Sequence, residues 1–230
     1  MTATRQVTLM MSVLVRQYWV RILAWVLPLV LLLTTVGPAY EGVYPTLGER
    51  APLISTLESN VVSILLYGPI GSPGTIGQLI VLESGAYALI LGGLMAILLT
   101  INFTRQGEDD RTTEHLRAAG MAPWVPTVAG TLLSLIVSCL LGIGIATSLS
   151  IQSLLVEELT LSGAWSLGLL VASACAFFSA VTAVLAQVFE RADLARRWAM
   201  VLLAAAFLLR MIPDAELVGE KFTGELDQIS

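Results

Sequence analysis

The sequence is poor in charge and in the residues that bind metals or nucleotides. Only 13% of its 230 residues are charged and 56% are hydrophobic, whereas a soluble surface carries roughly 25–35% charged residues. Much of the surface must therefore face something other than water, which excludes an ordinary cytosolic enzyme. The formal net charge of -5 argues against nucleic acid as a ligand of the whole chain.

The scarce residues also exclude several mechanisms. Cys139 and Cys175 both lie inside long apolar stretches, where free cysteine usually packs as a small hydrophobic residue instead of forming a disulfide or a metal site. The single histidine, His115, cannot supply an H-E-x-x-H zinc motif. The single lysine, Lys221, follows Glu220, so the phosphate-binding motif G-x-x-x-x-G-K-[ST] is absent. We therefore expect no catalytic residue, no metal and no cofactor bound by this chain, and any ATP and Mg²⁺ would belong to a partner subunit.

Five stretches are long and apolar enough to cross, or nearly cross, a membrane. A helix needs about 20 mainly apolar residues to span the hydrocarbon layer, and its backbone groups must be satisfied internally. The sequence therefore predicts an all-α, polytopic membrane helical bundle that forms a single transmembrane domain over residues 1–230. The predicted spans are 19–36, 83–101, 124–149, 164–188 and a shorter one at 198–212, and a polar external tail follows at 213–230.

The basic residues indicate the orientation of the bundle. Nine arginines fall on one side of the predicted spans, three around the start of the first span, three between the second and third, and three between the fourth and fifth. By the positive-inside rule this side is cytoplasmic. The opposite side holds only Arg50 and Lys221 as basic residues. We therefore predict a multi-pass protein with a cytoplasmic N-terminus and an external C-terminus, provided that the short fifth stretch crosses.

Residues 5–18 precede the first span with an amphipathic pattern. At about 100° per residue, one face of a helix here would be apolar and the other would carry Arg5 and Arg16. The apolar face comprises Val7, Met10, Met11, Leu14 and Tyr18. This pattern predicts an interfacial helix on the cytoplasmic side. An extension of the first span is the alternative.

The connection between the second and third predicted spans is the most informative polar stretch. Asp109 or Asp110 can cap a short helix that begins near Arg111. Glu114 and Arg117 have the i,i+3 spacing of an ion pair on that helix. Such a helix could transmit force from a soluble partner, or its charges could only set the topology of a solvated connector, and both interpretations remain open.

The external connection at 37–82 is the longest. Four glycines and two prolines from Gly68 to Gly77 exclude a continuous helix there. This region either caps an external vestibule or forms a passive loop.

One charged residue lies inside a predicted span. Arg210 follows Arg197 by thirteen residues, which places it roughly 20 Å up a helix from the cytoplasmic side. Glu83 opens the second span at that same outer level. Because buried charges in membranes need partners, we hypothesise a Glu83–Arg210 pair; extension of Arg210 to the external surface is the alternative.

Small residues recur at four-residue spacing on two predicted spans. Such stripes let helices approach closely in lipid, within one subunit or between two. They comprise Ala88, Gly92 and Ala96, and Ala172, Ala176 and Ala180.

The order of these features is similar to that of a known family. After the interfacial helix and the first span come YPTLGERAPL, LLYGP, a second span rich in small residues, and TRQGEDDRTTEHLRAAGM, and later LAQVFERADLARRWA and AFLLRMIPDA. From about Val13 to Asp214, the chain resembles the N-terminal half of bacterial ATP-binding-cassette (ABC) exporter permeases described as polyketide antibiotic exporters, within the type-two ABC transporter permease superfamily.

The resemblance implies a function, partners and a location. In that family, a permease of two six-span halves works with a separate ATPase subunit that docks on cytoplasmic coupling helices. By resemblance, Val7–Tyr18 is the elbow helix and Gly107–Gly120 is the coupling helix. The implied coupling residues are Glu108, Asp109, Asp110, Arg111, Glu114, His115 and Arg117. The implied protein is a permease subunit of the bacterial cytoplasmic membrane that exports a hydrophobic small molecule, such as a polyketide antibiotic or drug.

The chain departs from the family pattern after Asp214. The sequence ELVGEKFTGELDQIS is too polar for a sixth span, so the resemblance implies either a second permease half or homodimer, or a fragment of a longer permease. Two rival functions also remain open. One is a permease of the same superfamily that moves haem or a lipid, and the other is a non-transporting membrane scaffold or accessory protein.

Overall fold

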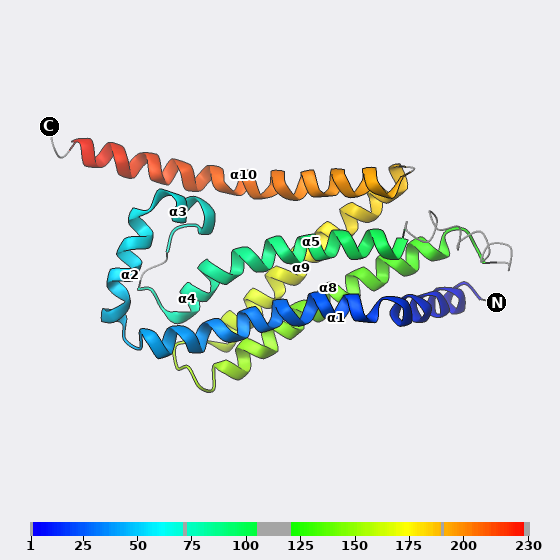
Figure 1. The fold of residues 1–230 in the computed structure, drawn as a ribbon, viewed down its shortest axis with the longest axis horizontal. Helices are drawn as coiled ribbons and strands as arrows, with labels where there is room; N and C mark the ends of the chain where they lie inside the picture. Colours follow the sequence, from blue (N-terminus) through cyan, green and yellow to red (C-terminus); the bar gives the residue numbers. More distant parts are fainter. Residues whose placement is uncertain (1, 71–72, 105–120, 190, 228–230) are drawn as a thin grey trace.

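The computed structural model describes residues 2–70, 73–104, 121–189 and 191–227, with side chains described up to Ala215. All regular elements within these ranges are helical, which confirms the predicted all-α class (Figure 1). The elements are α1 (Ala3–Val43), α2 (Leu47–Ser59), α3 (Val61–Tyr67), α4 (Ile76–Ile80), the π-helical turn η1 (Val81–Gly85), α5 (Ala86–Thr104), α8 (Val125–Gln152), α9 (Leu161–Val188) and α10 (Ala192–Asp227).

Five helical segments within the described residues are long and apolar enough to cross a membrane, as the sequence predicted. They are Ala3–Val43, Ile76–Thr104, Val125–Gln152, Leu161–Val188 and Ala192–Ala215. The second begins at Ile76 instead of residue 83 because Thr75 caps it. The Thr75 hydroxyl accepts a hydrogen bond from the Gln78 backbone N–H at 3.3 Å, and the Gln78 side chain accepts one from the Thr75 N–H at 2.8 Å. This capping box starts the helix directly after the stretch rich in glycine and proline.

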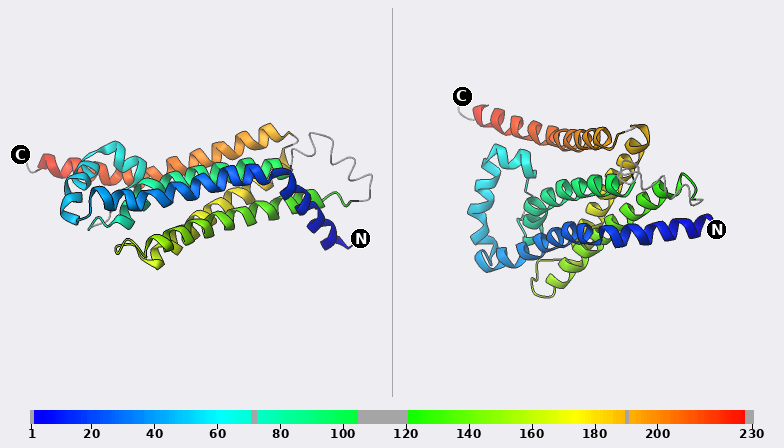
Figure 2. Two further views of the ribbon diagram at one scale, coloured as in Figure 1. Left: turned by 60° about the horizontal axis from the view of Figure 1, so that its bottom comes forward. Right: turned by 45° about the vertical axis from the view of Figure 1, so that its right-hand side comes forward.

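Helix α1 contains both the predicted interfacial helix and the first predicted span. Figure 2 shows, in its left view, that the N-terminal part of α1 bends away from the rest. Leu14 and Tyr18 are buried, and the Tyr18 ring packs edge-on against Phe103 with centroids 5.5 Å apart. The bent part is therefore held against the bundle by residues of its predicted apolar face.

The last helix, α10, is longer than the predicted span at 198–212. It begins at Ala192 and continues through Pro213 to Asp227. The candidate span ends at Ala215, so the polar region predicted as a tail begins as a continuation of the helix.

Helix α5 lies at the centre of the bundle. In the apolar core stretch of its span, 61% of the residues are buried, whereas the corresponding shares are 17% in α1 and 11% in α10. Helices α8 and α9 approach closely, since a Cβ added to Gly142 would lie 2.5 Å from the Gly168 carbonyl oxygen. Gly92 of the α5 stripe packs against Cys175 of α9, whereas Ala180 of the α9 stripe is exposed. Small residues thus allow close helix packing inside this chain.

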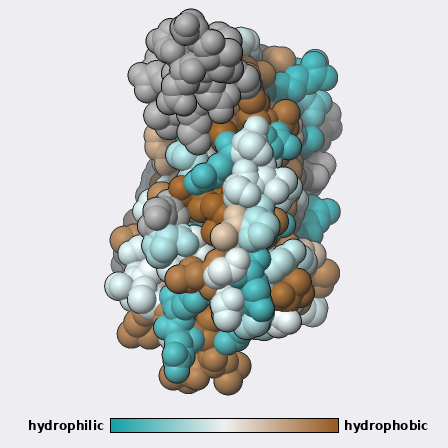
Figure 3. Space-filling model, turned by 90° about the vertical axis from the view of Figure 1, so that its left-hand side faces the viewer, coloured by the Kyte–Doolittle hydropathy of each residue, from teal (hydrophilic) through white to brown (hydrophobic). Residues whose placement is uncertain are grey.

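The two ends of the bundle differ in composition. The basic end contains the chain N-terminus, the end of α5, the start of α8, Arg191 in the α9–α10 turn, and the start of α10 with Arg196 and Arg197 (Figure 1). The cap end consists of α2, α3, residues 68–70 and 73–75, and the α8–α9 loop at 153–160. Figure 3 looks onto the cap end and shows hydrophilic and hydrophobic side chains interspersed across it. Arg5 and the arginines at the start of α10 and in the turn before it share one end, as the predicted topology requires, while the direction of insertion stays a prediction.

Candidate functional site: the cavity at the cap end

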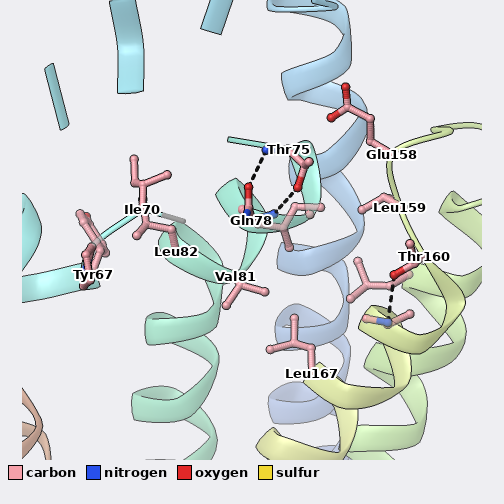
Figure 4. Close-up of a pocket in the computed structure, with 16 residues that line it drawn as sticks. Tyr67, Ile70, Thr75, Gln78, Val81, Leu82, Glu158, Leu159, Thr160 and Leu167 are labelled. Carbon is pink, nitrogen blue, oxygen red and sulfur yellow. Dashed lines mark hydrogen bonds between the residues drawn. The ribbon is translucent and has the colours of Figure 1, made fainter. Parts of the chain in front are cut away.

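A cavity of about 500 Å³ opens at the cap end. It lies between α4, η1, the residues after α3, the α8–α9 loop and the start of α9 (Figure 4). Most of its wall is apolar, and a smaller set of polar residues forms a rim. The apolar residues include Ile80, Val81, Leu82, Leu149, Ala164 and Leu167. The polar rim comprises Thr75, Gln78, Glu158 and Thr160.

Local backbone chemistry builds the walls of the cavity. The Thr75 capping box starts α4 on one side. On the other side, the Thr160 hydroxyl accepts a hydrogen bond from the Gly163 N–H at 3.2 Å and caps α9. Gly68 and Gly74 have φ values of 95° and 81°, a region that favours glycine; Gly68 ends α3, and Gly74 directly precedes the N-cap Thr75 of α4. Two helix starts and two glycines with positive φ therefore shape this cavity.

A bidentate ion pair lies beside the cavity. The Arg50 side chain is fully buried, and its two terminal nitrogens donate to the two carboxylate oxygens of Glu158 at 2.6 and 3.0 Å. Arg50 also donates to the carbonyl oxygens of Tyr44, Pro45 and Gly74, at 2.8, 3.0 and 3.4 Å. The planar arginine guanidinium is suited to this two-point bonding to a carboxylate. These bonds offset the high free-energy cost of burying the positive charge.

Glu158 connects the pair to the second span. Its carboxylate also accepts the Ile76 backbone N–H at 2.9 Å, an N–H in the unpaired first turn of α4. Bonding to Arg50, followed by the bond from Ile76, lowers the pKa of the Glu158 carboxyl, although partial burial opposes this effect. The Arg50–Glu158 bridge, as we call the pair, therefore joins α2, the α8–α9 loop and the start of α4.

The sequence indicated Arg50 and Glu158 only in part. Arg50 is the lone arginine in the predicted external connections, and Glu158 is one of several acidic residues on that side. A lone arginine among acids suggests an ion pair, but the two residues are 108 positions apart. No local spacing could choose Glu158 over the other acids.

The structure does not bring the hypothesised Glu83–Arg210 pair together. The Arg210 guanidinium donates to the carbonyl oxygens of Leu66 and Tyr67 at 3.0 and 2.8 Å, and it lies 3.7 Å from the Asp214 carboxylate one turn further along α10. Glu83 instead accepts a hydrogen bond from the Tyr40 hydroxyl of α1. Arg210 therefore joins α10 to the end of α3, and Glu83 joins the second span to the first.

The predicted coupling residues lie outside the residues that the structure describes. These residues are Glu108, Asp109, Asp110, Arg111, Glu114, His115 and Arg117, all within 105–120. Their role stays a prediction.

Hydroxyl groups that were not predicted join the helices in the interior. Thr100 of α5 and Ser134 of α8 lie 2.6 Å apart, oxygen to oxygen, and Ser134 lies 2.8 Å from Ser179 of α9. All three side chains are buried. They hydrogen-bond across three helices, as polar side chains do inside membrane bundles. Within the described ranges, no group of three His, Cys, Asp or Glu residues could hold a metal ion.

Comparison with known proteins relates the chain to a transporter. No family model matches the sequence. The chain is 30% identical over 193 residues to the multidrug efflux system permease protein Rv1217c of Mycobacterium tuberculosis. The match covers 83% of this chain and 34% of the relative, so the chain spans about a third of the length of the curated relative it matches. With its five candidate spans, the chain is a multi-pass helical membrane protein related to a multidrug efflux permease.

Proposed function

We propose that the chain is a membrane-spanning permease subunit of an ABC exporter. It moves a hydrophobic small molecule, such as a polyketide antibiotic or drug, out of a bacterial cell by alternating access. The observation that supports this most directly is the similarity over 193 residues to a multidrug efflux permease. The five apolar spans supply the membrane part of such a transporter. The sequence has no phosphate-binding loop, which is consistent with ATP and Mg²⁺ being bound by a separate ATPase subunit.

The energy for transport reaches the bundle through residues 105–120 in this proposal. This segment joins α5, the most buried span, to α8. A push on it from a nucleotide-bound ATPase repacks the helices around α5, and alternating access needs such a difference in contacts between two states. The two helix ends that this segment connects, the end of α5 and the start of α8, lie at the basic end of the bundle, which is predicted to be cytoplasmic.

The bundle works with a second permease half, which belongs to the same polypeptide, to a further polypeptide or to a second copy of this chain. Two observations support this part of the proposal. The matched relative is about three times as long as the aligned region, since the match covers 34% of it. In addition, α10 and α1 bury little of their apolar surface in this chain, which leaves surface for other helices or for lipid.

A permease for haem or a lipid would share this topology, and transport assays with those cargoes would separate the alternatives. A non-transporting scaffold predicts that no ATPase co-purifies with the chain. The similarity to an efflux permease favours the exporter.

The test is to purify the tagged chain from its native membrane in mild detergent and to identify its partners. We expect a subunit with a phosphate-binding loop, and drug-stimulated ATP hydrolysis after reconstitution into liposomes. The double variant Glu114→Arg/Arg117→Glu should reduce this stimulation at least tenfold. The matched control is Glu157→Arg, a charge reversal at an exposed residue of the cap end. An unaltered ATPase response in the double variant would contradict the coupling role, and a purified assembly without an ATPase would contradict the exporter.

A further inference from the structure

The cap-end cavity has the size and lining of a small-molecule site. Its volume of about 500 Å³ lies within the range of about 300–1,000 Å³ typical of ligand pockets. In Figure 4, Thr75 and Gln78 lie above Val81 and Leu167, while Leu82 and Thr160 lie at a similar height on opposite sides. A mainly apolar wall with a few polar groups is the usual composition of such pockets.

The side-chain oxygens of the rim already accept hydrogen bonds within the protein. The Thr75 and Thr160 hydroxyls accept backbone N–H bonds at the starts of α4 and α9. The Gln78 side-chain oxygen accepts the N–H groups of Gly74 and Thr75, both at 2.9 Å or less. The rim therefore closes off helix ends, and a ligand gains little by competing for these bonds.

Glu158 is the one acidic residue among the described residues that line the cavity, and its carboxylate is already hydrogen-bonded. Both of its oxygens accept hydrogen bonds from the Arg50 guanidinium, and one of them also accepts the Ile76 N–H. In Figure 4 its carboxylate points away from Leu167. An organic cation in the cavity would have to displace a bidentate arginine to gain a counter-ion. An organic anion would meet a guanidinium that is fully buried and already bonded.

The wall also contains an unusual helical turn. Val81 and Leu82 belong to η1, a π-helical turn inside the second span. Such turns are rare in proteins, and a large share of those that do occur lie at functional sites. Val81 is 50% exposed and stands at this wall, where a ligand can reach it without unpacking the core.

From these observations we propose that the cavity binds a neutral, largely apolar small molecule, and that it discriminates against organic cations. The affinity comes from burying apolar surface against η1 and the start of α9. The discrimination comes from the Arg50–Glu158 bridge, because this bridge leaves the rim without a free counter-charge. The role of the site in export rests on the proposed function, but the binding itself needs no ATP and no partner.

Photolabelling of the full chain in nanodiscs tests this proposal. The probe is 3-trifluoromethyl-3-(m-iodophenyl)diazirine, a neutral apolar photolabel, and labelled peptides are mapped by mass spectrometry. The competitors are neutral N-phenyl-1-naphthylamine and cationic tetraphenylphosphonium. We expect label at residues 79–82 and 159–167 that the neutral competitor displaces at a concentration at least tenfold below that needed for the cation. Label on the exposed face of α9, for instance at Phe177, should resist both competitors.

Two variants locate the site. Val81→Trp adds bulk at the exposed part of the wall and should reduce the displaceable label at least fivefold. Ala164→Phe fills the buried part, and its matched control is Ala180→Phe, the same change at an exposed position of the same helix. If Ala164→Phe does not fold, Val81→Trp at the exposed part of the wall decides the outcome.

Three results would overturn the proposal. The first is the absence of displaceable label in the cavity. The second is equal displacement by the cation and the neutral competitor, which would refute the discrimination. The third is a phospholipid that co-purifies in the cavity and is not displaced, which would make the cavity a structural lipid site. None of these results bears on whether an ATPase assembles with the chain, so failure here is distinguishable from failure of the export function.

Discussion

Neutralising one partner of the Arg50–Glu158 bridge should destabilise the protein strongly. Glu158→Gln keeps the shape of the side chain but leaves the buried Arg50 guanidinium without its counter-ion. Removing one partner of a buried ion pair costs about 3–5 kcal/mol. Glu158 retains 30% side-chain exposure and Arg50 keeps three carbonyl acceptors. We therefore expect the lower end of that range, about 3 kcal/mol of unfolding free energy.

The assay is equilibrium unfolding of the purified chain in mixed dodecyl sulfate and mild-detergent micelles, followed by circular dichroism. The matched control is Glu157→Gln, at the adjacent exposed residue, which should shift the unfolding free energy by less than about 0.5 kcal/mol. Combining Glu158→Gln with Arg50→Met removes the unpaired charge, so the double variant should be less destabilised than the sum of the two single variants. If the two glutamate variants unfold alike, or if the double variant shows simple additivity, then the bridge does not stabilise the cap end.

Three further predictions concern other contacts. Gly142→Ala places a Cβ 2.5 Å from the Gly168 carbonyl oxygen and should lower the unfolding free energy by about 1–3 kcal/mol, whereas Gly42→Ala, with nothing within 4 Å, should not lower it in the same titration. Arg210→Gln weakens the bonds from α10 to the carbonyl oxygens that end α3, so amide hydrogen exchange in α3 should accelerate at least threefold while exchange in α8 stays unchanged. Because the pKa of Glu158 is lowered in the folded protein, its contribution to stability is fully present above the unfolded carboxyl pKa of about 4.3 and is lost as the pH falls through the lower folded pKa; Glu158→Gln should flatten the stability profile in that acidic window, and an unaltered profile would refute the assignment.

The spans could be predicted because the bilayer imposes a length and a composition on each of them. All five predicted stretches have a counterpart among the candidate spans. Their ends were harder to predict because hydropathy ignores capping. The stretch after Gly68 contains glycine and proline, yet Thr75 and Gln78 form a capping box within it and start a helix at Ile76. The sequence predicted a polar tail at 213–230, but α10 continues through Pro213 to Asp227.

The charged contacts show where prediction from the sequence stops. Counting helical rise placed Arg210 at the level of the cap end, and it does bond to the end of α3 there. Its acidic partner was mistaken, because Asp214 lies one turn away on the same helix and needs no second helix to be positioned. The position of a charge along a predicted span gives its depth in the membrane. Its partner depends on side-chain geometry, which only the packed fold supplies.

The ion pair at the cap end follows the same pattern: the sequence predicted the side of the bundle on which it lies, but not the pairing itself. Charge counting assigned Arg50 and Glu158 to one side of the bundle, and the structure places them there. A buried arginine needs a carboxylate with two available oxygens and a backbone that supplies further acceptors. Here the α8–α9 loop supplies the carboxylate of Glu158, and Tyr44, Pro45 and Gly74 supply the carbonyl oxygens. Among the few charges of this membrane protein, the buried pair is therefore the one expected to matter most for stability. A screen of single charge neutralisations should therefore find its largest stability losses at Arg50 and Glu158, and small ones at exposed residues such as Glu157.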